Sequence, residues 1–329
     1  MKHFFTFCLL FFILSFAVAQ PQQDLYNTAK SLMKEGDYEN ATLVLYKLLL
    51  NEPNNIAAQK DYAFANYYKK DYKKSIEIAK QLIKDSTTDD QIYQILGMNY
   101  KALGLTKDCN KTYREAIVKF NNAGFFYNEI GELFFAQNQT DSAVKYWEKG
   151  IESDPNYATN YYNAAMYYSR YSQPFWAAIY GEVFVNLESY TVKTAEVKQA
   201  IIDAYRKILY QSSLSINSKN KFEKKVIETI GNTNETLIVN TLTAIRTKFI
   251  LSWFYEKNNE TLPYKLFEHQ RFLIQQGMFD AYNQWLFGVV LNPIQYKIWV
   301  DAHKVEANAF ETLQQNKVFK LTVGEYYKL

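Results

Sequence analysis

Small residues recur every 34 positions through the first half of the chain, between larger apolar residues that could fill a core. Two such sets run in parallel without a gap. The first set is Ala29, Ala63, Gly97, Gly131 and Ala165, and the second is Ala41, Ser75, Cys109, Ala143 and Ala177. The spacing predicts a repeated pair of antiparallel helices. We expect a small residue of one helix to face a small residue of the other where the axes come closest, because bulk there would force the helices apart.

Two stretches carry the clearest version of this pattern. They are Leu96-Gly97-x-x-Tyr100 with Ala116, and Ile130-Gly131-x-x-Phe134 with Ala143, Trp147 and Pro155. On these residues the sequence resembles the tetratricopeptide repeat family, whose unit of 34 residues is a helix-turn-helix. In one register the five repeats are 22–55, 56–89, 90–123, 124–157 and 158–191. The resemblance implies an all-α fold, a solenoid that winds as a right-handed superhelix of helix-turn-helix repeats.

The spacing of 34 ends after the fifth repeat, but apolar residues continue at helical spacing. Residues 194–211 predict a helix that caps the solenoid, so that repeats and cap together occupy 20–211. The polar stretch 211–220 predicts a domain boundary, and 212–329 predict a smaller all-helical C-terminal region.

Two details of that region are specific enough to test. Asn292-Pro293 predicts a helix start, and the helix that follows carries aromatic and small residues on one face. These residues are Tyr296, Trp299, His303, Ala307 and Phe310. Residues 318–323 alternate weakly, which fits either a short strand or an extended tail.

Residues 1–19 have the pattern of an export signal. A basic start at Lys2 precedes an apolar run over 4–18, and a small-x-small site ends at Ala19 before Gln20. An uncleaved anchor is the alternative. We expect cleavage after Ala19 and no membrane span afterwards. The Ala-Gln junction and a composition rich in Lys, Asn, Ile and Tyr favour export to the periplasm or outer-membrane periphery of a Gram-negative bacterium.

Composition and charge argue against several classes of function. The formal net charge of +3 over 329 residues is too small for a nucleic-acid footprint. Cys109, the one cysteine left after signal cleavage, occupies a small-residue position and predicts a packed thiol. The sequence has no Gly-rich phosphate loop, no Cys-x-x-Cys pair and no nucleophile elbow. We therefore expect no catalytic residues, no cofactor and no metal site.

Two alternatives place a functional site in 220–329. The first is an envelope enzyme, and its candidate residues are Glu268, His269, Asp301 and His303. The second is a carrier for a peptide or glycan that uses aromatic stacking, which a deep apolar pocket lined by Trp253 or Trp285 would favour.

The main hypothesis is a protein-binding scaffold or adaptor of the bacterial cell envelope. In the tetratricopeptide family the first helix of each repeat lines a concave groove through its second, fifth, ninth, twelfth and thirteenth positions. Mapped here, the predicted partner-binding residues are Tyr26, Lys30, Lys60, Phe64, Tyr67, Met98, Phe125, Asn128, Phe135, Tyr162 and Arg170.

The kind of partner follows from the residue types in that groove. The paired Lys and Asn with which the family clamps a carboxylate are not matched. Aromatic and amide side chains instead favour an extended peptide or an amphipathic helix with apolar anchors. The alternative is that the aromatic residues only pack against neighbouring repeats. The aromatic residues in question are Phe64, Tyr67, Phe125 and Phe135.

Overall fold

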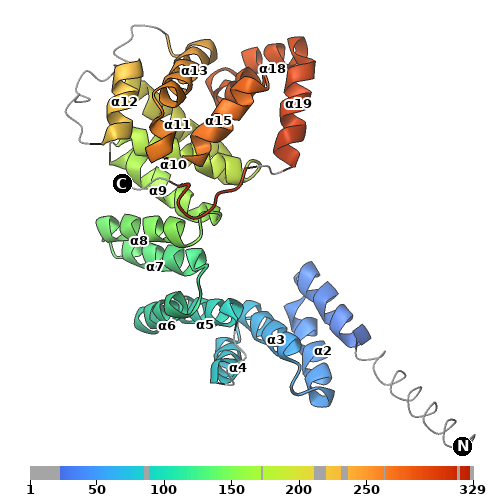
Figure 1. The fold of residues 1–329 in the computed structure, drawn as a ribbon. Coiled ribbons are helices and arrows are strands. Elements are labelled where there is room, and N and C mark those ends of the chain that lie inside the picture. The colour runs from blue at the N-terminus through green and yellow to red at the C-terminus, as the bar shows by residue number, and fades with distance from the viewer. Residues whose placement is uncertain are drawn as a thin grey trace, which may run out of the picture. The chain divides into compact units, whose positions relative to one another are not determined.

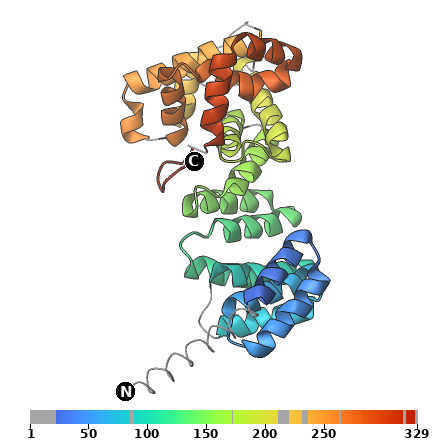
Figure 2. The ribbon, with the colours of Figure 1, turned by 90° about the vertical axis from the view of Figure 1, so that its right-hand side faces the viewer.

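The structure is a computed structural model that describes residues 23–84, 89–171, 173–210, 220–230, 236–262, 264–316 and 319–326. Regular secondary structure in these ranges is helical throughout, and no strand occurs in them (Figures 1 and 2). The predicted signal segment and most of the predicted boundary at 211–220 lie outside the described residues, so both stay predictions. Contacts between Cα atoms divide the chain into two compact units, Met1–Phe120 and Asn121–Leu329.

The first unit consists of antiparallel helix pairs. Its helices are 23–35, α2 (Tyr38–Asn51), α3 (Ile56–Tyr68), α4 (Tyr72–Lys84), α5 (Asp90–Ala102) and α6 (Thr106–Lys119). Side chains set two of these helix starts. The Asp37 carboxylate accepts a hydrogen bond from the Asn40 backbone N–H (3.1 Å), and the Asn55 side chain accepts one from that of Ala58 (3.0 Å), so each cap satisfies a donor that the helix itself leaves unpaired.

The helix starts confirm the repeat register. First helices begin at Ile56, Asp90, Gly124 and Ala158, which are the first residues of repeats two to five. Second helices begin at Tyr38, Tyr72, Thr106, Thr140 and Pro174, again 34 residues apart. This period of paired helices is the tetratricopeptide-repeat arrangement.

The small residues of both sets are buried, as predicted. Ser75 faces Ala63 closely enough for its hydroxyl to donate to the Ala63 carbonyl (2.8 Å). The expectation that small always faces small is wrong at the two glycines. A Cβ on Gly97 would lie 2.0 Å from the Tyr113 ring, and one on Gly131 would lie 2.3 Å from the Trp147 indole. A large ring of the second helix therefore occupies the space that the glycine leaves.

The second unit continues the pairs and adds the C-terminal helices. Its repeat helices are α7 (Gly124–Ala136), α8 (Thr140–Ser153), α9 (Ala158–Arg170), α10 (Pro174–Leu187) and α11 (Val192–Tyr210). The C-terminal helices are α12 (Lys221–Ile230), α13 (Val239–Tyr255), α14 (Asn258–Thr261), α15 (Lys265–Gln275), α16 (Phe279–Asn283), η1 (Gln284–Gly288), α17 (Val289–Leu291), α18 (Pro293–Ala302) and α19 (Lys304–Gln315). The predicted helix at 194–211 and the predicted start at Asn292-Pro293 are both confirmed.

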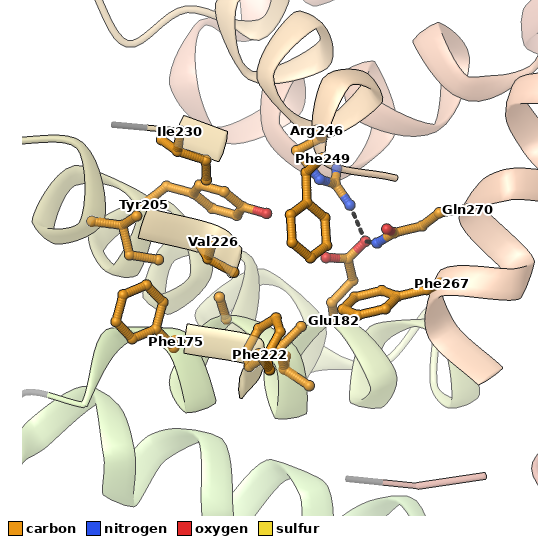
Figure 3. Close-up of a pocket in the computed structure, with 13 residues that line it drawn as sticks. Phe175, Glu182, Tyr205, Phe222, Val226, Ile230, Arg246, Phe249, Phe267 and Gln270 are labelled. Atoms are coloured by element: carbon orange, nitrogen blue, oxygen red, sulfur yellow. Dashed lines mark hydrogen bonds and ion pairs between the residues drawn. The ribbon is translucent and has the colours of Figure 1, made fainter. Parts of the chain in front are cut away.

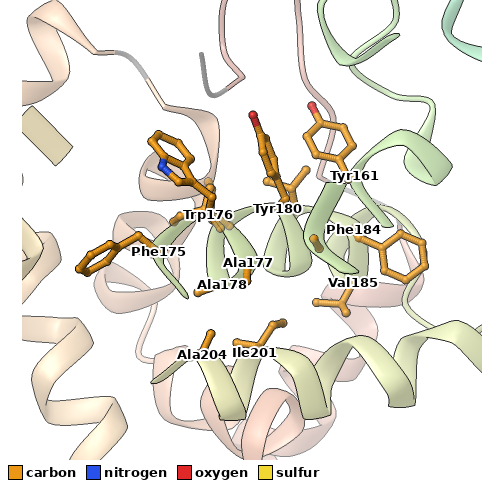
Figure 4. Packing of buried hydrophobic residues seen from close by; sticks show 14 of the residues in the cluster. Tyr161, Phe175, Trp176, Ala177, Ala178, Tyr180, Phe184, Val185, Ile201 and Ala204 are labelled. Atoms are coloured by element: carbon orange, nitrogen blue, oxygen red, sulfur yellow. The ribbon is translucent and has the colours of Figure 1, made fainter. Parts of the chain in front are cut away.

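Helix α10 is the centre of the second unit. Every residue of α10 except Leu187 is buried. Helices α9 and α11 pack on two of its faces (Figure 4). The C-terminal helices also contact it, since Trp176 packs against Phe222 of α12 and Glu182 accepts a hydrogen bond from Tyr282 of α16. One hydrophobic core extends from Ala143 to Tyr326 and includes, or is packed against by, residues of every helix from α8 to α19 except α14. The C-terminal helices therefore pack directly on the last two repeats.

A buried polar network joins α10 to the C-terminal helices (Figure 3). Glu182 on α10 and Arg246 on α13 form an ion pair and are 1% and 3% exposed. Glu182 Oε1 also accepts from Gln270 of α15 (2.6 Å) and from the hydroxyl of Tyr282 of α16 (2.8 Å). Charges so deeply buried are tolerated only when they are paired and hydrogen-bonded, so the network fixes how these four helices meet.

The predicted continuous helix through His303 is wrong. Helix α18 ends at Ala302 and α19 begins at Lys304, with His303 between them. A straight helix would carry Phe310 about 16 Å beyond Trp299 along its axis. The break instead returns Phe310 to the core, where its ring packs on Tyr282 and Trp285 at centroid distances of 5.7 and 5.8 Å.

The described part of the C-terminal segment, residues 319–326, forms no strand: residues 319–322 have no regular secondary structure, and residues 323–326 form a turn and a bend. Asn156, in the turn between α8 and α9, pairs with the backbone of Leu321. Its Nδ2 donates to the Leu321 carbonyl (2.8 Å), and its Oδ1 accepts from the Leu321 N–H (3.0 Å). The side chains of Phe319 and Leu321 are buried in the core, so the tail is fastened along its length.

Candidate functional site

A groove of ≈ 590 Å³ lies in the second unit, between side chains of α7, α8, α9 and the start of α11. Three of the predicted partner-binding residues line it: Phe135 on α7, and Tyr162 and Arg170 on α9. The structure thus brings together residues from the first helices of two repeats, as the family mapping implied. Met166 lies between the two α9 residues and adds a further apolar side chain.

Hydrogen bonds hold the tyrosines of this groove in place. The Tyr162 hydroxyl donates to Glu196 of α11 (2.9 Å), and the Tyr167 hydroxyl donates to Asp141 of α8 (2.7 Å). Burial and these carboxylates raise the pKa of both tyrosines to about 12, so they act as neutral hydrogen-bonding groups at physiological pH. The Lys193 ammonium lies 4.2 Å from the centre of the Tyr162 ring, a cation–π contact that further restricts the ring.

Two carboxylates of the groove have hydrogen-bond partners, whereas its guanidinium has none among the described residues. Glu132 accepts from Asn163 (2.8 Å), and Glu196 accepts from Tyr162. Arg170 is exposed at the end of α9, and its guanidinium has no hydrogen bond or ion pair to any other described residue. Phe135 is 39% exposed beside it. An apolar surface with an available guanidinium is therefore presented to solvent.

Two predicted residues of the second unit serve packing. Phe125 makes edge contacts with the rings of Phe126 and Tyr157. Asn128 is 3% exposed, and its Oδ1 accepts from Asn163 of α9 (2.9 Å). Neither residue is among those that line the groove.

In the first unit the predicted lysines are already paired. Lys30 lies 3.3 Å from the Asp61 carboxylate, which also accepts from the Tyr26 hydroxyl (2.8 Å), and Lys60 pairs with Asp89. Asp61 lies in α3, the first helix of the repeat after that of Lys30, and Asp89 is the N-cap residue of α5, the first helix of the repeat after that of Lys60. This pairing gives a physical reason why these positions do not form a carboxylate clamp.

The predicted aromatic residues of the first unit contact other aromatic rings. Phe64 lies 4.7 Å from Tyr68 between ring centroids, and Tyr67 contacts both Tyr68 and Tyr72. Phe64, Tyr67 and Met98 are all half-buried. These contacts supply packing, and they leave one face of each side chain partly accessible.

Several groove residues were missed by the repeat mapping. Trp147 comes from a second helix, Tyr171 from the turn after α9, and Lys193 and Glu196 from the capping helix. The mapping considers only first helices of the five repeats, so it could not include them. Treating the capping helix α11 as a sixth first helix would have found the last two.

The alternative sites in 220–329 have different surroundings from those expected. His269 is half-buried between the rings of Tyr282 and Phe319, and loss of contact with water, with a smaller effect of Lys265, lowers its pKa to about 4. His303 instead stacks on Trp299, with ring centroids 4.6 Å apart. The two histidines are thus held in separate places. Among the described residues, no group of three or more His, Cys, Asp or Glu side chains could hold a metal ion.

The two tryptophans proposed for a carrier also differ from each other. Trp253 is fully buried in an aromatic cluster with Phe222, Phe249 and Phe267, so it lines no open pocket. Trp285 lines a cavity of ≈ 220 Å³ between η1, α18 and α19. Its ring carries the Lys198 ammonium at 3.7 Å from the centroid.

Comparison with known proteins gives fold-level likenesses. No family model and no curated protein matches the sequence. Among solved structures, the chain is similar to the C-terminal part of a TPR repeat-containing protein from Cytophaga hutchinsonii (14% identity, 89% of this chain and 93% of that one, TM-score 0.44). It is also similar to PilF of Pseudomonas aeruginosa (14% identity, 56% of this chain and 83% of that one, TM-score 0.47). A third similar structure is YrrB, described as a TPR protein with an unusual peptide-binding site (17% identity, 53% of this chain and 90% of that one, TM-score 0.38).

The fold is that of a tetratricopeptide-repeat protein, and this assignment rests on the spacing and packing of the chain's own helices. Among the described residues, no helix has the length and apolar character needed to cross a membrane.

Proposed function

We propose that this protein is a scaffold that binds a segment of another protein in the groove between α7, α9 and α11. The observation that carries the proposal is the combination of exposed Phe135, apolar Met166 and unpaired Arg170 around tyrosines that are already fixed by hydrogen bonds. Aromatic, methionine and arginine side chains are the types enriched at protein interfaces. Fixed side chains lose little conformational entropy on binding, which favours affinity.

The segment that suits this groove is an extended peptide or an amphipathic helix with apolar anchors and an acidic residue. Phe135 and Met166 would contact the anchors, and Arg170 would pair with the acid. Lys30 and Lys60 of the first unit are neutralised by Asp61 and Asp89, so the segment needs no cluster of carboxylates at these two positions.

We place this scaffold in the cell envelope because residues 1–19 have the composition of an export signal. Intact-mass measurement of the protein purified from its own cells tests this part. A periplasmic or secreted form that begins at Gln20 supports it. A membrane-bound form that retains residues 1–19 would instead make the protein an anchored one.

The binding proposal is tested by affinity capture from the envelope, with mass spectrometry of the bound proteins. A Phe135→Ser/Met166→Ser variant should stay folded by circular dichroism and bind the captured partner at least about 30-fold more weakly, since a hot-spot side chain contributes roughly 2 kcal/mol. Val118→Ser is the matched control, because Val118 is an 87% exposed apolar residue of the other unit. A folded double variant that keeps every partner would refute the groove as the binding site.

A further inference from the structure

A second groove, of ≈ 500 Å³, lies between the start of α13, the π-helix η1 and α18. None of the residues that line it is Asp, Glu, Lys or Arg, although these make up 22% of the chain. Ile238 and Ile298 stand at its edge and are 49% and 54% exposed. The groove is separate from the one lined by α7, α9 and α11, and it was not found from the sequence.

The deepest polar group of this groove is the amide of Gln284. The residue is 5% exposed, yet its side chain has no hydrogen bond to any other described residue. Gln284 lines the groove, so the donor and the acceptor of its amide face the space that a ligand would occupy. A ligand lying there could pair with both groups in place of water.

The local backbone is arranged to hold this amide. Residues Gln284–Gly288 form a π-helix, a conformation that often occurs at functional sites. A Cβ on Gly288 would lie 2.6 Å from Gln284 Oε1 and 3.3 Å from the Tyr296 ring. Glycine at this position therefore leaves room for the amide and for Tyr296 on α18.

The same chain already shows how a primary amide can pair with backbone that lies in neither a helix nor a strand. Asn156 donates to the carbonyl and accepts from the N–H of Leu321 in the C-terminal tail, and the apolar side chain of Leu321 is buried. Gln284 offers the same donor and acceptor, and the aliphatic residues around it could bury apolar side chains.

We propose that the groove of α13, η1 and α18 binds an extended protein segment with uncharged, apolar side chains, and that Gln284 pairs with the backbone of this segment. The lack of charged lining residues selects against charged side chains, which would lose their hydration without gaining a partner. This site is independent of the groove between α7, α9 and α11, which we call the repeat groove. A test can therefore refute one of the two binding sites without refuting the other.

The test is selection of a phage-displayed random heptapeptide library on the protein from Gln20 to Leu329, followed by fluorescence polarisation with the enriched peptides. We expect uncharged, apolar peptides. Gln284→Met keeps the side-chain volume and removes the amide, so it should weaken their binding at least tenfold while the circular dichroism spectrum stays that of the wild type. Ile298→Arg places a charge at the groove and should also weaken binding at least tenfold.

Two matched controls make the result specific. Ile294→Arg introduces the same charge on α18 at a residue that is 73% exposed and does not line the groove, and it should bind like the wild type. Phe135→Ser, in the repeat groove, should also leave the affinity of these peptides unchanged.

Several outcomes would overturn the proposal. They are enrichment of charged peptides only, no enrichment at all, or equal binding to Ile298→Arg and Ile294→Arg. A dimer of the wild type that dissociates in Ile298→Arg would show that the groove contacts a second copy of the chain. Quenching of tryptophan fluorescence by maltoheptaose that depends on Gln284, without peptide binding, would make the ligand a neutral glycan.

Discussion

The glycine-to-ring contacts of the repeats lead to a quantitative prediction for Gly97→Ala. A Cβ at this position would lie 2.0 Å from Tyr113 Cε1, whereas ordinary van der Waals contact begins near 3.4 Å. The ring would have to move by at least about 1.4 Å. Tyr113 is fully buried, and a close-packed interior has no space into which its ring could move without displacing other side chains.

Two terms of opposite sign decide the magnitude. Alanine favours a helix over glycine by roughly 1 kcal/mol, so a site without the clash would gain stability. Overpacking costs roughly 1–3 kcal/mol and occasionally more, and a contact of 2.0 Å is at the severe end. We therefore expect a net loss of about 2 kcal/mol in the free energy of unfolding.

The assay is urea unfolding followed by circular dichroism, with hydrogen exchange measured on peptides of α5 and α6 to locate the effect. A double-mutant cycle with Tyr113→Leu supplies the control, because the smaller side chain should relieve the clash. Gly97→Ala should then cost less in the Tyr113→Leu background than in the wild type. Equal or greater stability of Gly97→Ala alone would refute the packing described for this contact.

Three further predictions follow from buried groups of the second unit. Burial lowers the pKa of Lys198 from 10.5 to about 7, so its stability penalty is fully present below pH 7 and is relieved towards pH 10.5. Lys198→Met should therefore exceed the wild type in melting temperature at pH 6, and this advantage should shrink steadily as the pH rises from 7 towards 10.5. Arg246→Met leaves Glu182 buried and unpaired and should cost roughly 3–5 kcal/mol, whereas Glu182→Met/Arg246→Met should cost less in urea unfolding. Asn156→Ala removes both hydrogen bonds to the tail, so amides of residues 319–326 should exchange faster without a change in exchange of α5.

The repeat register could be predicted from the sequence because close approach of helices restricts residue size at fixed spacing. Gly97 and Gly131 carried that signal, and the helices begin where the register places them. The identity of the facing residue could not be predicted in the same way. A glycine reports that space is needed, but not whether a small residue or a ring such as Trp147 fills it.

The contacts that the C-terminal helices make with the repeats do not appear in the sequence as a repeated spacing. Glu182 and Arg246 are 64 positions apart, and Asn156 and Leu321 are 165 apart. Neither pair recurs in the chain, so no period marks it. The π-helix at Gln284–Gly288 is also invisible to a search for apolar spacing, because that search assumes the period of an α-helix.

The contacts of α10 and α11 with the C-terminal helices mean that binding to either groove has to be studied with the C-terminal helices present. Helix α11 supplies Lys193 and Glu196 to the groove between α7, α9 and α11. The same helix carries Lys198, which donates a hydrogen bond to the Trp285 carbonyl of η1 (2.7 Å). A fragment that ends near residue 211 would lose this bond and would leave Glu182 on α10 without its ion-pair partner. Because an unpaired charge and an uncovered apolar face both destabilise a fold, the repeats of the second unit need the C-terminal helices, and loss of binding by such a fragment would not locate a binding site.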